Sequence, residues 1–324
     1  LLDAAQAMMP ACSRRALLGL GTALALPGCA VQPRLDGAPP VVLPGTRQID
    51  VAAGDGSGRV RRIMLAVPPA AAPAQGWPVL YVLDGDLLFT LAAQLMRNRF
   101  ARGPGVPAEG AVVVGLGYAG EQVLDLDARS YDYTPPAPGP ATDARGRREG
   151  GADAFLDFID ATVRPQVAHA VRVDAARQTL FGHSFGGLCT LHALFTRPGG
   201  FRNYVAASPS VWWRGGFLLQ EQARFVAGRR AGAPPLRLLV TQGEREAEAA
   251  AEPPKDPARA AMVRERQGGE RLRALLGGLR GVPGLDLRFA SFAGADHGSS
   301  MLPAVQQALA LAIGGAGAGA GGGG

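Results

Sequence analysis

Short apolar runs alternate with amphipathic segments along most of the chain. The runs typical of buried strands lie at residues 60–67, 79–83, 111–115, 178–181, 204–207, 236–241 and 285–289. The positions that share one helical face are Phe155, Phe158, Ile159 and Val163 in one segment, and Leu188, Leu191, His192 and Phe195 in another. Apolar strands that alternate with helices predict an α/β fold, with a mostly parallel sheet covered by helices on both faces.

The first strand segments predict an exception to the parallel order. Residues 46–53 and 59–67 flank the turn-forming pair Asp55-Gly56, so we expect an antiparallel hairpin at the edge of the sheet. The alternation extends over residues 42–313 and shows no internal repeat, which predicts a single domain. The Gly/Ala-rich residues 314–324 offer little to bury and are expected to form a disordered tail.

The N-terminal segment has the pattern of an export signal. Ser13-Arg14-Arg15 precedes the apolar residues 16–26, which are too few for a spanning helix of about 20 residues. The arginine pair is typical of the twin-arginine route, and residues 26–29 are similar to a lipobox that ends at Cys29. We therefore expect residues 1–29 to be an export signal and residues 30–41 a linker. The protein is then expected in the periplasm. Either Cys29 is lipidated and attaches the protein to a membrane, or an ordinary signal peptidase removes the signal without lipidation.

Charge and cysteine content narrow the classes of function. The net charge is +6, but the arginines that supply it are scattered, so no nucleic-acid partner is predicted. Cys12 and Cys29 lie in the leader, which leaves Cys189 in an apolar helical context. No disulfide framework and no metal site are predicted, and Cys189 is expected to be a buried core residue.

One motif carries the predicted chemistry. Residues 179–187 read T-L-F-G-H-S-F-G-G, in which a buried strand leads into G-x-S-x-G and then into a helix. This context is typical of a nucleophile elbow, with Ser184 as the nucleophile. Gly182 and Gly186 are expected to remove collisions with the neighbouring strand and helix.

A serine nucleophile requires a base, which this fold supplies late in the chain. His297 follows the last predicted strand, whereas His169, His183 and His192 are interpreted as structural. A third residue, an acid, orients the histidine. In this fold the three residues follow one another along the chain as serine, acid and histidine, which places the acid after the strand at residues 236–241.

The candidate acids there belong to one short acidic run. Glu246 is the first choice and Glu244 the second. Such an acid holds the imidazole in the right tautomer. Asp296, adjacent to His297, is a poor candidate because neighbouring side chains on an extended loop diverge.

An oxyanion hole requires two backbone N–H groups. Phe185, which follows the nucleophile, is expected to supply one of them. Asp86 is expected to supply the other, because it follows the tight turn at Gly85 after the strand at residues 79–83.

Several segments together resemble one family. They are P-V-L-Y-V-L-D-G-D at 78–86, V-V-V-G-L-G-Y at 112–118, R-S-Y-D-Y-T-P-P at 129–136, G-H-S-F-G-G at 182–187 and A-S-P-S-V-W-W at 207–213. The combination resembles the esterase-D-type α/β-hydrolases, and within them the periplasmic enzymes that hydrolyse the trilactone of catecholate siderophores such as enterobactin and salmochelin. The resemblance covers residues 42–312 and implies the α/β-hydrolase fold.

The resemblance also implies binding residues. Arg129 would line the substrate pocket, where a guanidinium suits an anionic aromatic ligand. Tyr131, Trp212 and Trp213 would add stacking surface. Two structural interpretations stay open, in which the tryptophans are core residues and Arg129 fixes its own loop. Some members of the family work with a Ser/His pair alone, which leaves the role of the glutamate open.

The predicted function is therefore hydrolysis of a carboxylic ester, most specifically the backbone of a ferric or apo catecholate siderophore, by a monomer without metal or organic cofactor. The alternatives are a general, feruloyl or acetyl esterase, an acyltransferase of the same fold, and a siderophore-binding lipoprotein without activity.

Residues 115–120 also match the dinucleotide-binding pattern G-x-G-x-x-G. No second strand ending in an acid follows them, so dinucleotide binding is not predicted.

Overall fold

The computed structural model describes residues 36, 38–56, 58–101, 109–247, 256, 260 and 269–314. The chain divides into two units, Leu1–Val42 and Leu43–Gly324. In the first unit the description covers residues 36 and 38–42 only. The expected export signal with Cys29 lies outside the described residues, as do most of the expected linker and tail. Within the described part of the chain, no helix is both long and apolar enough to cross a bilayer.

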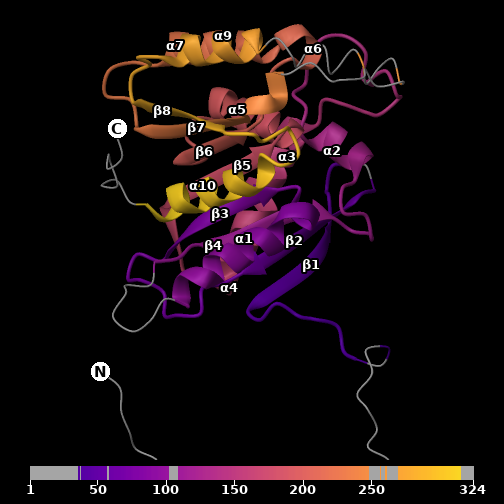
Figure 1. Cartoon of the computed structure of the whole chain (residues 1–324), viewed down its shortest axis with the longest axis vertical. Helices are drawn as coiled ribbons and strands as arrows, with labels where there is room; N and C mark the ends of the chain where they lie inside the picture. The colour runs from indigo at the N-terminus through magenta and orange to yellow at the C-terminus, as the bar shows by residue number, and fades with distance from the viewer. Residues whose placement is uncertain are drawn as a thin grey trace, which may run out of the picture. The chain divides into compact units, whose positions relative to one another are not determined.

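The second unit is built around one eight-stranded sheet (Figure 1). Its strands, in chain order, are β1 (Thr46–Ala52), β2 (Val60–Ala66), β3 (Trp77–Leu83), β4 (Val112–Tyr118), β5 (Val173–His183), β6 (Asn203–Ala207), β7 (Leu236–Gly243) and β8 (Leu285–Phe292). The helices are α1 (Gly85–Phe100), α2 (Leu126–Asp132), α3 (Ala152–Phe158), α4 (Arg164–Ala170), α5 (Phe185–Thr196), α6 (Trp213–Gly216), α7 (Leu218–Gly228), α9 (Glu270–Leu279) and α10 (Met301–Ile313). A π-helical turn, η2 (Ile159–Val163), joins α3 to α4, and a 3₁₀ turn, η3 (Glu244–Ala247), follows β7.

The strand order confirms the predicted mixed sheet. It runs β1-β2-β4-β3-β5-β6-β7-β8, with β1 antiparallel to β2 and β2 antiparallel to β4. The remaining neighbours are parallel. The hairpin predicted around Asp55-Gly56 therefore forms one edge of the sheet. Because β3, β5, β6, β7 and β8 run in one direction, their carboxyl ends meet at one edge, where this class of fold builds its sites.

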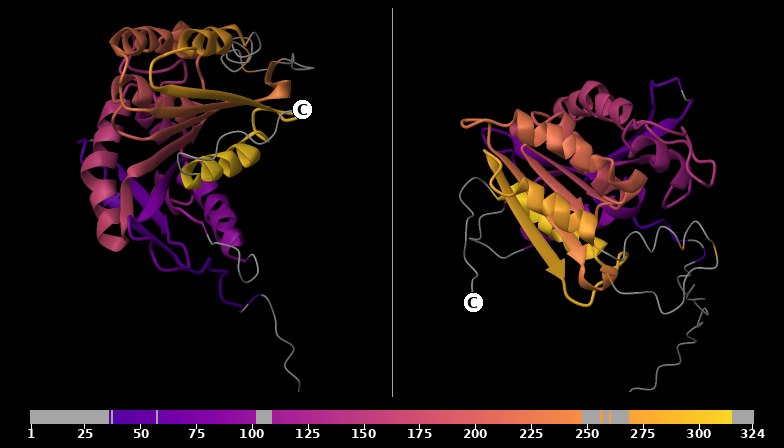
Figure 2. Two further views of the ribbon diagram at one scale, coloured as in Figure 1. Left: turned by 90° about the vertical axis from the view of Figure 1, so that its left-hand side faces the viewer. Right: turned by 90° about the horizontal axis from the view of Figure 1, so that it is seen from above.

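Side-chain alternation along the central strands divides the core into two layers. Val79, Tyr81 and Leu83 of β3 pack with α3, α5, α7 and α9, whereas Leu80 and Val82 pack with α1 and α10. Figure 2 shows α1 and α10 on one side of the sheet and the other long helices on the opposite side. Cys189 of α5 is fully buried in the first layer, as expected.

The strand β4 extends further than its apolar run predicts. It includes Gly115 and Gly117, which pair with β2. A side chain on Gly115 would lie 2.7 Å from Phe89, and one on Gly117 would lie 2.1 Å from the carboxylate of Asp86. Because these two glycines have no side chains, α1 can pack closely against β4. This packing accounts for the G-x-G spacing without any role in nucleotide binding.

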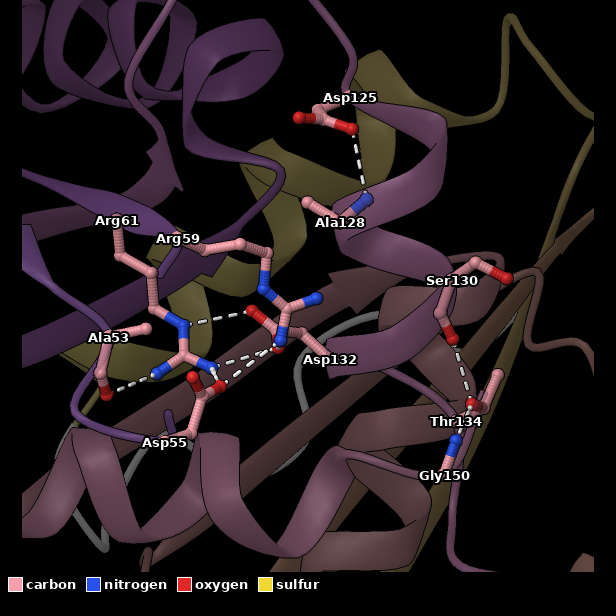
Figure 3. A network of polar contacts seen from close by, with 10 residues as sticks. All are labelled: Ala53, Asp55, Arg59, Arg61, Asp125, Ala128, Ser130, Asp132, Thr134 and Gly150. Atoms are coloured by element: carbon pink, nitrogen blue, oxygen red, sulfur yellow. Dashed lines mark hydrogen bonds and ion pairs between the residues drawn. The ribbon is translucent and has the colours of Figure 1, made fainter. Parts of the chain in front are cut away.

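A buried ion-pair network fixes α2 to the hairpin (Figure 3). Arg61 is almost fully buried and donates from Nε and Nη2 to Asp132, the last residue of α2. Asp55 accepts from both Arg59 and Arg61. The N-terminus of α2 is capped by Asp125, which accepts from the amide of Ala128. The helix that carries Arg129 is therefore held at both ends.

Candidate active site

Ser184 occupies a strained turn between β5 and α5. Its backbone angles are φ 59° and ψ −114°, a conformation that L-residues adopt at a cost. A side chain on Gly182 would lie 2.2 Å from the carbonyl oxygen of Gly186. The predicted collision at Gly182 is thus confirmed.

The collision predicted at Gly186 is wrong, because the close approach occurs at Gly187 instead. A side chain on Gly186 would meet its nearest neighbour, Leu83, at 3.4 Å, whereas one on Gly187 would lie 2.9 Å from the carbonyl oxygen of Ala207. The tight approach is therefore between α5 and β6, one residue later than expected. Gly187 therefore allows the start of α5 to lie directly against the sheet.

The Ser184 hydroxyl lies beside a second serine. Its Oγ is 3.3 Å from Oγ of Ser210, and the amide of Ser210 donates to the carbonyl oxygen of Ser184. The side chain of Ser210 is fully buried. Among the hydrogen bonds of the described residues, none joins Ser184 to His297, so the nucleophile and its expected base are not hydrogen-bonded to each other in this structure.

The structure brings His297 and Glu246 together. Nδ1–H of His297, on the loop between β8 and α10, donates to Oε2 of Glu246 at 2.9 Å. Oε1 of Glu246 accepts from Oγ of Ser208 and from the amide of Gly243, both at 2.6 Å. Burial raises the pKa of Glu246, but the hydrogen bond and charge of His297 and the two other donors outweigh it and hold this pKa below its usual range. The carboxylate is therefore ionised and orients the imidazole.

The other two acids considered for the triad face elsewhere. Glu244 accepts from the amide of Gly294. Asp296 accepts from the amide and hydroxyl of Ser299. Of the acids weighed from the sequence, only Glu246 has a hydrogen bond to His297 in the described structure.

Ser208 is a site residue that sequence reasoning missed. It adopts a positive φ of 43° after β6, which directs its hydroxyl to Glu246, 38 positions away in the chain. Its Oγ is also 3.0 Å from Oγ of Ser300, whose hydroxyl donates to the carbonyl oxygen of His297. The two serines of the S-P-S sequence at 208–210 thus contact the acid and the nucleophile respectively, and nothing in the sequence itself indicated these contacts.

His183 supports the backbone of the base. Its Nε2 lies 2.8 Å from the carbonyl oxygen of His297 and donates to it, and the two rings are 4.6 Å apart. Burial, followed by the nearby charge of His297, lowers the pKa of His183 to about 3. The ring is therefore neutral, and the structural interpretation of this histidine is confirmed.

The two expected oxyanion donors lie at adjacent helix N-termini. Phe185 is the first residue of α5 and Asp86 the second of α1, positions at which an amide has no partner within its own helix. The parent strands β5 and β3 are neighbours, and the Asp84 turn approaches Gly186. Asp86 directs its carboxylate away, to the amide of Tyr118. The geometry is thus compatible with both amides facing one oxyanion.

Arg129 lies behind this turn rather than in an open pocket. Its side chain is about nine-tenths buried, and Nε and Nη2 donate to the two carboxylate oxygens of Asp84 at 2.8 and 3.0 Å. Its guanidinium is 5.5 Å from the ring centroid of Phe185. This placement corresponds to the loop-fixing alternative, and a contact with substrate stays a prediction.

Two of the expected stacking residues are occupied by the protein itself. The guanidinium groups of Arg59 and Arg148 lie 4.3 and 4.7 Å from the ring centroid of Tyr131, and Gly151 closes on the same ring. Trp213 is 3% exposed and donates from Nε1 to Glu149. The placement of Trp213 thus corresponds to the alternative in which it is a core residue, and stacking of Tyr131 against a substrate stays a prediction.

Trp212 occupies a different place in the structure. It lines a hollow together with Glu246, His297, Ser208 and Arg271. Its ring centroid is 6.0 Å from that of Phe185, beside the nucleophile. Trp212 therefore lies close to both the expected base and the nucleophile turn, and its contact with a substrate stays a prediction.

A strained serine at a strand–helix turn, a histidine oriented by a carboxylate and two helix N-termini beside the serine define the class. The protein has the α/β-hydrolase fold with the residues of a serine hydrolase. It belongs to the family described as "Putative esterase", whose model matches residues 56–285.

Comparisons with individual proteins agree with this family. The chain is 42% identical over 178 residues to the siderophore enterobactin esterase of Emericella nidulans, an alignment that covers 52% of this chain and 57% of that protein. It is 32% identical over 209 residues to the ferri-bacillibactin esterase BesA of Bacillus subtilis, covering 63% of this chain and 72% of BesA. The aligned part thus spans little more than half of the first relative.

Solved structures match over a larger share. The siderophore hydrolase EstB from Aspergillus nidulans superimposes with a TM-score of 0.73 at 31% identity, over 85% of this chain and 98% of EstB. The enterobactin and salmochelin hydrolase IroE gives a TM-score of 0.62 at 26% identity, over 82% of this chain and 94% of IroE.

Proposed function

We propose that the protein is a serine esterase that hydrolyses the ester backbone of a siderophore. The observation that carries the proposal is the Ser208–Glu246–His297 hydrogen-bond chain beside the strained Ser184. Related proteins are named for several siderophores, among them enterobactin, bacillibactin and triacetylfusarinine C. These names support an ester-linked siderophore as the substrate class, and the resemblance of segments 129–136 and 207–213 favours a catecholate trilactone.

The proposed reaction has two halves. Nε2 of His297 accepts the proton of Ser184 as Oγ attacks the ester carbonyl, and the amides of Phe185 and Asp86 bind the oxyanion. His297 then protonates the leaving alkoxide, which leaves an acyl-serine. In the second half His297 deprotonates water, which attacks the acyl-serine; the bond between the acyl carbon and Oγ then breaks, the acid product is released, and His297 returns its proton to Oγ of Ser184. Glu246 stays ionised throughout and stabilises the imidazolium.

The experiment compares the purified chain with its Ser184→Ala variant. Chromatography follows conversion of enterobactin to linear trimer, and absorbance follows a short-chain nitrophenyl ester, each with and without a serine-directed phosphonate. We expect phosphonate-sensitive conversion of the trilactone at a kcat/KM well above that of the simple ester, and no turnover by Ser184→Ala. Cleavage of the simple ester alone would retain the serine esterase and reject the siderophore.

We also propose that the protein is exported to the periplasm and lipidated at Cys29. Support comes from the arginine pair, the apolar residues 16–26 and the Cys29 segment. In a bacterial host, mass spectrometry of the mature N-terminus tests this. A diacylated Cys29 that disappears in Cys29→Ser supports lipidation, whereas an unmodified N-terminus after residue 29 points to simple cleavage.

A further inference from the structure

The hollow beside the base contains a second arginine that the chemistry above does not use. Arg271, near the start of α9, lines it together with Trp212 and His297. Arg271 is half-buried. Within the described part of the chain, no carboxylate or hydrogen-bond acceptor engages its guanidinium. A cation on the wall of a site that has no anionic partner among the described residues is available to an anionic ligand.

The position of Arg271 is built into the fold. A side chain on Gly216 would lie 3.1 Å from Cδ of Arg271 and 3.2 Å from its Nε, and Gly216 has a φ of +90°. The stem of Arg271 therefore rests on the backbone at the end of α6, where any larger residue would displace it. Trp212 immediately precedes α6, so one short segment places both the aromatic ring and the seat of the arginine.

The two arginines near the site have opposite environments. Arg129 is buried and neutralised by Asp84, so it is not available to pair with a substrate anion without breaking that ion pair. Arg271 borders the hollow that holds His297 and Glu246. The carboxylate oxygens of Glu246 are engaged by Ser208, Gly243 and His297 and form no hydrogen bond or ion pair with Arg271.

We propose that Trp212 and Arg271 form a subsite for an anionic aromatic group of the substrate. The ring of that group packs against Trp212, and its oxygen anions pair with Arg271, which places the neighbouring ester between Ser184 and the oxyanion donors. The proposal rests on the proposed function. A catecholate meets these requirements, since its ring is planar and its oxygens are anionic when they bind ferric iron. The assignment differs from the resemblance, which gives the pocket arginine as Arg129.

The first test measures selectivity. Arg271→Met is compared with wild type on ferric enterobactin, whose catecholate oxygens are anionic, and on the fully O-methylated, uncharged analogue of enterobactin. We expect kcat/KM to fall about 10-fold or more further on ferric enterobactin than on the methylated ester, mainly through KM. Arg280→Met, at the exposed end of the same helix, is the matched control and should leave both rates at the wild-type level. An equal loss on both substrates, or no loss, would overturn the subsite.

The second test separates the subsite from the reaction. Binding of 2,3-dihydroxybenzoyl-serine to Ser184→Ala is followed by tryptophan fluorescence, with and without Arg271→Met. Weaker binding on removal of Arg271 supports the subsite even if the wild type does not open the trilactone, an outcome in which only the proposed function fails. Unchanged binding together with normal trilactone hydrolysis overturns the subsite and retains the function.

Discussion

Glu246 receives hydrogen bonds from three separate segments of the chain. Ser208, the amide of Gly243 and His297 all donate to its carboxylate, so both oxygens are engaged and the side chain is held in one orientation. Such a carboxylate fixes the tautomer of the imidazole. At the scale of single residues, this cluster decides how well the base works.

Glu246→Gln tests the role of that charge. A glutamine amide presents N–H to one of these donors, so His297 is expected to lose its orientation and kcat to fall about 10³-fold. Glu244→Gln is the matched control, because Glu244 faces Gly294, and it should change kcat less than about twofold. Steady-state kinetics on a nitrophenyl ester measures both. A Glu246→Gln enzyme with near wild-type kcat would show that Ser184 and His297 work as a pair alone.

Ser208→Ala tests the residue that positions Glu246. Loss of one short hydrogen bond to an anion is expected to raise the pKa of Glu246 and to lower kcat about 10-fold at neutral pH. The acid limb of the pH–rate profile should then move to higher pH. Ser299→Ala, which breaks a hydrogen bond to Asp296 instead, is the control. An unshifted acid limb would show that Ser208 has no influence on the acid.

The predictability of the site differs from residue to residue. Ser184 and His297 follow from a local motif and from chain order. The choice between Glu246 and Glu244 depends on how η3 turns after β7, which is a matter of loop geometry. Ser208 depends on a positive φ and on a partner 38 positions away, neither of which has a local signature.

The short helix α2 connects the edge hairpin to the turn at Asp84, which precedes the expected oxyanion donor Asp86. Asp132 at its end receives Arg61, and Arg129 in its middle holds Asp84, the residue directly before α1. Asp84 has a positive φ of 52°. At the scale of elements, α2 therefore fixes the strained turn that presents Asp86.

Arg129→Met distinguishes turn fixing from substrate contact. Leaving the buried carboxylate of Asp84 unpaired is expected to cost about 3–5 kcal/mol of unfolding free energy and most of the activity. Adding Asp84→Asn removes the unpaired charge, so the double variant should regain most of the stability and, if Arg129 only fixes the turn, most of kcat. Urea unfolding and nitrophenyl-ester kinetics measure the two. Stability that returns without activity would assign Arg129 to the substrate or to the reaction.

The strands show which features of an element the sequence predicts. Apolar runs located β3, β6 and β7 to within two residues at each end. They missed the start of β5, because Val173 pairs through its backbone with Trp77 in spite of polar neighbours. Backbone pairing with a neighbouring strand leaves little trace in the hydrophobic pattern.

At the scale of the whole molecule, two buried histidines outside the proposed triad are expected to make the free energy of unfolding depend on pH. His192 on α5 lies 2.9 Å from Glu221 of α7 and 3.2 Å from Asp153 of α3, so it joins three helices of one layer. Burial lowers the pKa of His192, but its hydrogen bonds to Asp153 and Glu221 outweigh burial and raise it to about 8. The pKa of His183 is displaced in the opposite direction, to about 3.

The two displacements destabilise the fold at opposite ends of the pH range. The lowered pKa of His183 favours the folded state above pH 6.5, and this stabilisation is lost as the pH falls from 6.5 toward 3, because the unfolded chain binds the extra proton. The raised pKa of His192 gives a stabilisation that is complete below pH 6.5. It is lost as the pH rises through 8. The free energy of unfolding is therefore expected to be largest near pH 6 to 7.

His192→Gln tests the alkaline side of this curve. Between pH 6 and pH 9 the wild type is expected to lose about 2 kcal/mol more unfolding free energy than the variant, since a displacement from 6.5 to about 8 corresponds to that difference. His169→Gln, at an exposed position on α4, is the matched control and should follow the wild type. Urea unfolding monitored by circular dichroism at both pH values measures the difference. Parallel curves for wild type and His192→Gln would show that the pKa of His192 is not raised in the folded protein.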